Sequence, residues 1–97
     1  MVRVETPPER QQELVEISKR VAPVFARVPG FVSYHLHRGR EGGVVISYLQ
    51  WRSEDDHLAC MSNPEVMAAG VEWMAFVSEA QAKLSVETFE VVSSIEN

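Results

Sequence analysis

The chain has 97 residues, the length of a single domain, and we predict that residues 1–97 form one. Hydrophobic residues make up 45% and charged residues 24%, which is an ordinary globular mixture and excludes a disordered chain. Fourteen acidic and nine basic residues give a net charge of −5, so binding to nucleic acid through its phosphates is not expected. The longest apolar run, residues 73–77, is too short to cross a membrane.

The single cysteine, Cys60, cannot form an internal disulfide. Because the N-terminus also lacks the features of a secretory signal, we expect a cytoplasmic protein. Cys60 has no evident base partner in the sequence, so nucleophilic catalysis by this thiol is not expected.

The first part of the chain predicts a strand followed by a helix. Residues 2–5 form a short strand candidate, and Thr6 stands where it can cap the helix that follows. Apolar residues then recur at three- and four-residue spacing as far as Val28, which indicates an amphipathic helix. Pro23 falls inside this pattern and predicts a bend just before it.

The rest of the chain predicts a hairpin, two helices and a last strand. Residues 31–38 and 44–52 are rich in β-branched and aromatic residues, and a five-residue connection makes them a hairpin. Ser53 and the three acidic residues after it begin a short helix, and Pro64 begins a longer one. Residues 86–95 close the chain as a strand. This βαββαβ order predicts an α+β, ferredoxin-like protomer, with helices on one face of a four-stranded antiparallel sheet.

The hairpin pattern leaves apolar side chains on both faces of the predicted sheet. If Arg38 lies opposite Val44, the odd residues of the two strands share one face and the even residues the other. The even face carries Val32, Tyr34, Leu36, Val44, Ile46, Tyr48 and Gln50. The odd face carries Phe31, Ser33, His35, His37, Val45, Ser47, Leu49 and Trp51. Since two helices cover only one face, we expect a homodimer packed sheet to sheet, or else a C-terminal segment folded over the open face.

Several motifs resemble those of a known family. They are Pro29 to Ser33 with Leu36 to Arg38, the run 44–53 that ends in Gln-Trp-Arg-Ser, Asn63-Pro64-Glu65, and Phe89 to Val92. Together these segments span nearly the whole chain and resemble the antibiotic biosynthesis monooxygenase domain family. The motifs are specific for its superfamily of dimeric α+β barrels, and less specific for the activity.

The resemblance implies a homodimeric barrel with a substrate cavity between sheet and helices in each subunit. Oxygenases of this family oxidise multi-ring phenolic polyketide intermediates with molecular oxygen and use no flavin, haem or metal, so no cofactor is expected. Trp51 matches the family's strand-terminal tryptophan, and His37 falls where some members have a histidine. Ser47 replaces the family's asparagine, and a hydroxyl has a shorter reach than an amide.

We therefore predict catalytic roles for His37, Trp51 and Ser47, whose N–H and O–H groups suit a developing oxyanion. The predicted substrate-binding residues are His35, Phe31, Leu49, Met67, Trp73, Met74 and Phe76. Each also has a structural interpretation: Trp51 as a core anchor, Ser47 as a small residue under a helix, and His37 as a solvated side chain. The tyrosines are expected at the subunit interface. Two histidines on one strand face supply too few ligands for a metal site.

The leading functional hypothesis is a cofactor-free monooxygenase that oxidises a hydrophobic aromatic intermediate of antibiotic biosynthesis. One alternative is a non-oxidative polyketide cyclase or isomerase that uses the same cavity with a general acid or base. Another is a dimer that binds a small apolar ligand without catalysis.

Overall fold

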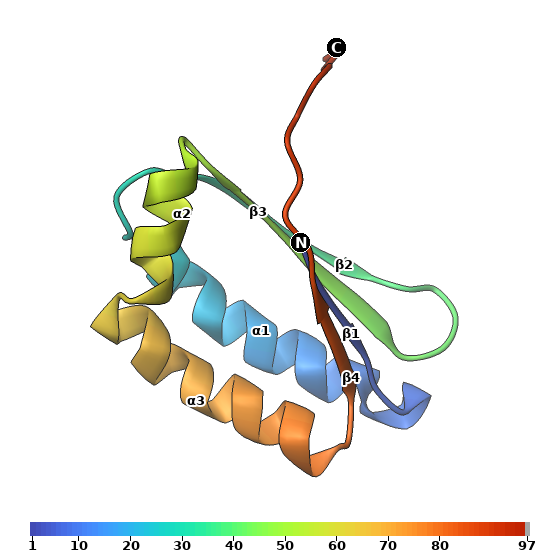
Figure 1. Cartoon of the computed structure of the whole chain (residues 1–97). Coiled ribbons are helices and arrows are strands. Elements are labelled where there is room, and N and C mark those ends of the chain that lie inside the picture. The colour runs from blue at the N-terminus through green and yellow to red at the C-terminus, as the bar shows by residue number, and fades with distance from the viewer. Residues whose placement is uncertain (97) are drawn as a thin grey trace.

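The computed structural model describes residues 1–96 and contains the predicted βαββαβ order. In chain order the elements are β1 (Val2–Glu5), the 3-10 helix η1 (Pro8–Arg10), α1 (Gln11–Phe25), β2 (Phe31–Arg38), β3 (Val44–Trp51), α2 (Glu54–Met61), α3 (Pro64–Glu79) and β4 (Lys83–Val86). The four strands pair antiparallel in the order β2-β3-β1-β4. Figure 1 shows α1 and α3 together on one side of this sheet. The ferredoxin-like α+β prediction is confirmed. None of the helices described is long and apolar enough to span a membrane.

Side-chain caps fix the starts of α2 and α3. The Ser53 hydroxyl accepts a hydrogen bond from the amide of Asp56 at 3.1 Å, and the Asn63 side chain accepts from the amide of Glu65 at 2.9 Å. These bonds satisfy N–H groups that a first helical turn leaves without partners. The predicted cap at Thr6 is wrong. The Thr6 amide instead donates to the Gly43 carbonyl at 3.0 Å, and its side chain is buried beside the hairpin loop.

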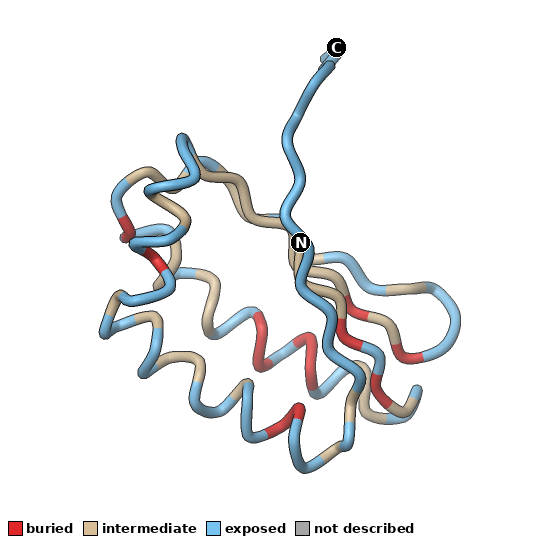
Figure 2. Tube along the Cα trace, in the orientation of Figure 1, coloured by how far each residue is buried: buried red, intermediate tan, exposed pale blue. Residues whose placement is uncertain are grey.

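The core lies where α1 and α3 cover β1 and β3, as the buried segments in Figure 2 show. Its members are apolar and come from all four of these elements: Val4, Leu14, Val15, Ile17, Val45, Phe76 and Val77. Full burial of one such side chain stabilises the fold by about 1.5–3 kcal/mol. The face of the sheet that carries Val4 and Val45 is therefore the helix-facing face.

The register of the β2–β3 hairpin differs by one residue from the prediction. Arg38 lies opposite Val45 rather than Val44. The side-chain amide of Gln11 donates to the carbonyls of Gly39 and Val44, at 3.0 and 2.9 Å, and so holds the mouth of the hairpin in this register. Because side chains alternate along a strand, a slip of one residue exchanges the two faces of one strand relative to the other.

An irregularity at Val32 changes the faces once more. Phe31 lies opposite Trp51 but Ser33 lies opposite Gln50, so β2 has one extra residue at this point. Phe31 therefore shares the helix-facing side with Trp51, whereas Ser33 lies on the outer face, where its hydroxyl donates to the Gln50 side chain at 2.8 Å. The predicted grouping of all the odd residues on one face is wrong.

The last strand is earlier and shorter than predicted. β4 covers Lys83–Val86, and Val86 pairs with Val2 at the very start of β1. Glu87 still bonds to Met1, but β1 offers no further partner groups, so the predicted strand over 86–95 does not form. Residues 88–96, which we call the C-terminal arm, leave the body of the molecule (Figure 1). The arm therefore does not fold over the outer face of the sheet.

Candidate functional site

A cavity of about 290 Å³ lies between the helix-facing side of the sheet and the two long helices. All four strands supply its floor: Val2, Tyr34, Ser47, Leu49, Leu84 and Val86. The helices α1 and α3 supply its roof: Ser18, Val21, Phe25, Val66, Gly70, Trp73 and Met74. Among the described residues that line it, none is charged, and the polar groups are three hydroxyls and one indole N–H. Such a lining suits a largely apolar ligand that carries a few oxygen atoms.

Two side-chain pairs hold the walls of this cavity. In the roof, the Trp73 indole donates to the Ser18 hydroxyl at 3.2 Å, which uses the one indole N–H of the lining. Towards β2, the rings of Phe25 and Tyr34 stack with centroids 6.4 Å apart and planes inclined by 16°. Tyr34 and Ser47 belong to the floor below.

The cavity opens towards the edge of the sheet that β4 forms. Three of its lining side chains are substantially exposed, Met74 by 51%, Leu84 by 40% and Val86 by 61%. The other lining side chains from α1, β2 and β3 are buried or half-buried. A ligand can therefore enter between α3 and β4 and reach Tyr34 and Ser47 at the inner end.

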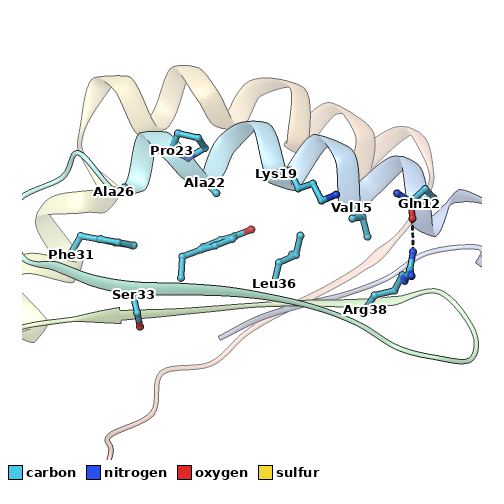
Figure 3. A pocket seen from close by; sticks show the side chains of 11 residues that line it. Gln12, Val15, Lys19, Ala22, Pro23, Ala26, Phe31, Ser33, Leu36 and Arg38 are labelled. Carbon is cyan, nitrogen blue, oxygen red and sulfur yellow. Dashed lines mark hydrogen bonds between the residues drawn. The ribbon is translucent and has the colours of Figure 1, made fainter.

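A second hollow, a solvent-open groove of about 820 Å³, runs between α1 and β2 (Figure 3). In Figure 3, Phe31, Leu36 and Arg38 point from β2 towards α1, whereas Ser33 points away from it. Arg38 donates to the side chain of Gln12 at one end of the groove. Among the described residues, Tyr34 alone lines both the groove and the cavity.

Four of the predicted site residues come together at the cavity. Ser47 and Leu49 on β3 form part of its floor, and Trp73 and Met74 on α3 form part of its roof. Phe31 lines the groove instead.

Four other predicted site residues lie away from the cavity. His35 and His37 are exposed on the outer face, opposite Tyr48 and Ile46, because of the one-residue change in register. On α3, Met67 is 61% exposed and Phe76 is buried in the core, where the Arg10 guanidinium lies 4.7 Å from its ring centroid.

Trp51 lies on the helix-facing side of the sheet and is the last residue of β3. Its ring meets the edge of Phe31 at 5.8 Å and stacks on His57 at 6.2 Å. Neither Trp51 nor His57 is among the described residues that line the cavity or the groove.

Sequence reasoning missed the contribution of Tyr34, which it assigned to a subunit interface. Burial raises the pKa of Tyr34 above its ordinary value, and a hydrogen-bonding interaction with the Ser47 side chain acts in the opposite direction. The correct hairpin register would have brought these two residues to one face.

Burial likewise raises the pKa of the Cys60 thiol, which is free. In the part of the chain that the structure describes, no group of three His, Cys, Asp or Glu side chains could hold a metal.

Comparisons with known proteins agree with this fold. The chain is 42% identical over 60 residues to the tetracenomycin-F1 monooxygenase of Streptomyces glaucescens, covering 61% of this chain and 54% of that protein. The chain thus spans about half the length of this curated relative. The cofactor-independent oxygenase SnoaB of Streptomyces nogalater superposes with a TM-score of 0.67 at 21% identity, over 95% of this chain and 94% of that one.

A monooxygenase of Streptomyces coelicolor in complex with nanaomycin D superposes with a TM-score of 0.57 at 25% identity, over 96% of this chain and 90% of that one. The family model described as antibiotic biosynthesis monooxygenase matches residues 1–71. This match covers well over half of the sequence, so the chain belongs to the antibiotic biosynthesis monooxygenase family.

Proposed function

We propose that this protein is a cofactor-independent monooxygenase that oxidises a hydrophobic, aromatic, polyketide-type intermediate with molecular oxygen. The proposal is supported by membership of the family and by the relatives that act on tetracenomycin F1 or bind nanaomycin D. The observation that carries it is the cavity of about 290 Å³, which has apolar walls and three hydroxyl-bearing residues, Ser18, Tyr34 and Ser47, in its lining.

This environment suits a reaction in which the substrate itself reduces oxygen. Apolar walls exclude water, and the hydroxyls can stabilise the oxygen atom of an ionised phenol. The substrate must be electron-rich, because it supplies every electron that dioxygen receives.

An anthrone illustrates the balance of the reaction. Its CH₂ carbon loses a proton, and the resulting anion reacts with O₂ to form a C–O bond and, after protonation, a hydroperoxide. Loss of the remaining C–H proton with cleavage of the O–O bond leaves a carbonyl group and one water molecule. Four electrons pass from the carbon to O₂, one oxygen atom enters the product and the other becomes water.

Oxygen uptake with an anthrone, followed by mass spectrometry of the product, tests this proposal. We expect uptake of one O₂ per anthrone and a product in which one oxygen replaces two hydrogens, at a rate above the uncatalysed oxidation. A product of unchanged mass, or one that has lost only water, would instead identify a cyclase or isomerase. Binding with no product would identify a ligand-binding dimer.

We also propose that the protein works as a homodimer joined through the outer face of the sheet. Val44, Ile46 and Tyr48 lie on this face, away from the helices. The C-terminal arm adds further apolar side chains that are more than half exposed: Phe89, Val91, Val92 and Ile95. Apolar surface of this extent is typical of an interface. Light scattering should give twice the mass of the 10.9 kDa chain, and a monomer at micromolar concentration would overturn the proposal.

The catalytic roles of His37 and Trp51 stay predictions. In a homodimer, the exposed His37 would have to act through the interface, whereas Trp51 would have to act from the end of β3 beside His57. Turnover by His37→Ala and Trp51→Phe tests each role separately. Binding roles for His35, Phe31, Met67 and Phe76 are open to the same test.

The single free cysteine supports a cytoplasmic location, where thiols stay reduced.

A further inference from the structure

The register of the hairpin brings two residues that carry hydroxyl groups, Tyr34 and Ser47, to the floor of the cavity. Tyr34 on β2 pairs with Leu49, and Leu36 pairs with Ser47, so Tyr34 and Ser47 are diagonal neighbours on the helix-facing side. A long aromatic side chain can reach its diagonal neighbour across an antiparallel pair. Both residues line the cavity.

The ring of Tyr34 is held in one orientation. Phe25 of α1 stacks on it at 6.4 Å, which restricts the tilt of the phenol ring. Tyr34 also borders the groove beneath α1, so its ring separates the two hollows. A ring fixed in this way presents its hydroxyl to a ligand at little entropic cost.

The hydroxyl of Tyr34 suits donation of a hydrogen bond without loss of its proton. Burial raises the pKa of Tyr34, so its phenol keeps its proton below pH 10.0, the ordinary value from which the shift starts. The indole N–H of Trp73 is already bonded to Ser18. The Ser18 hydroxyl accepts that bond in the roof, so Tyr34 and Ser47 supply the side-chain donors of the floor.

We propose that the Tyr34 hydroxyl, beside Ser47 on the cavity floor, donates a hydrogen bond to the ionised phenol oxygen of the substrate. This inference rests on the proposed function, and it defines the substrate class more closely as a phenol or enol whose oxygen reaches the inner end of the cavity. Negative charge on that oxygen promotes electron transfer to O₂. Tyr34 therefore selects ionisable ring systems over plain aromatic hydrocarbons.

Replacement of Tyr34 by Phe tests the hydroxyl alone, because it keeps the ring and its stacking on Phe25. Ser78→Ala is the control, since it removes a hydroxyl from an exposed position of α3 outside the cavity lining. We expect kcat for an anthrone to fall about 100-fold in Tyr34→Phe with a KM within about threefold of wild type, and about tenfold in Ser47→Ala. Ser78→Ala should keep wild-type kinetics. An unchanged kcat in Tyr34→Phe would overturn the inference.

A binding measurement separates this inference from the proposed oxidation. The phenol of 2-hydroxyanthraquinone changes its visible absorption on ionisation, so a titration of the bound probe gives its pKa. We expect that pKa to be about one unit higher on Tyr34→Phe than on wild type, which is a tenfold loss of ionisation. Equal values on the two proteins, or no binding to wild type, would overturn the inference.

The two experiments fail independently of each other. If wild type consumes no oxygen with an anthrone but the pKa of the probe depends on Tyr34, the proposed monooxygenase function is wrong and the hydrogen bond from Tyr34 is right. If wild type and Tyr34→Phe oxidise an anthrone at equal rates, the hydrogen bond from Tyr34 is wrong and the proposed monooxygenase function is right.

Discussion

The Trp73 indole and the Ser18 hydroxyl, 3.2 Å apart, join α3 to α1 across the roof of the cavity. Ser18 is 4% exposed and Trp73 is half-buried, so water does not readily replace either partner. Removal of Ser18 Oγ leaves the indole N–H unsatisfied at the cavity wall. This bond therefore contributes both to the stability of the fold and to the shape of the cavity.

Replacement of Ser18 by Ala should lower the free energy of unfolding by about 1–3 kcal/mol, because a polar group in the wall loses its partner. Urea denaturation measures the change. Ser78→Ala, at an exposed position of α3, is the control and should change stability by less than about 0.5 kcal/mol. Equal effects of the two substitutions would show that the bond contributes nothing.

Gly70 offers a way to fill the cavity from its roof. A Cβ atom built on Gly70 meets nothing within 4 Å, and the residue lies within α3. Gly70→Ala should therefore stabilise the protein by about 1 kcal/mol through helix propensity alone. Gly70→Leu should also fold, but its side chain occupies the cavity. We expect binding of 2-hydroxyanthraquinone to weaken at least about tenfold in Gly70→Leu relative to Gly70→Ala, and equal binding would contradict the assignment of this cavity as the ligand site.

Thr6 carries a buried hydroxyl that has no hydrogen-bond partner among the described residues. Its backbone amide bonds to the Gly43 carbonyl, and that bond does not depend on the side chain. Thr6→Val has nearly the same shape and removes the unsatisfied group, so it should raise the free energy of unfolding by about 1 kcal/mol. Thermal and urea unfolding measure this, with Thr88→Val in the exposed arm as the control. A loss of stability in Thr6→Val would show that the hydroxyl is satisfied in solution.

The raised pKa of Tyr34 predicts a dependence of stability on pH. The folded state holds the phenol proton above the ordinary pKa of 10.0, at which the unfolded chain releases it. The contribution of this group to stability is therefore complete below pH 10.0 and is lost as the pH rises through the folded-state pKa. The urea midpoint of wild type should fall relative to that of Tyr34→Phe as the pH rises across this range. Parallel curves would contradict it.

The order of the elements could be predicted from local patterns. Ser53 and Asn63 mark helix starts because the groups that cap a helix are neighbours in sequence. The alternation of apolar residues in 31–38 and 44–51 likewise identifies two strands without knowledge of their partners. Thr6 shows the limit of such signals, since its place beside Gly43 depends on a loop distant in sequence.

The sequence by itself determined the βαββαβ order and the family, because caps, periodicity and motifs are local properties of the chain. Only the tertiary structure decided which side chains meet in the cavity. The pairing of Arg38 with Val45, at the hairpin mouth that Gln11 bonds, places Tyr34 inward and His37 outward, and the extra residue at Val32 returns Phe31 to the inner side. No local pattern records a choice between two pairings one residue apart. Strand side chains alternate with a period of two, so that single choice determines the chemistry on each face of the hairpin.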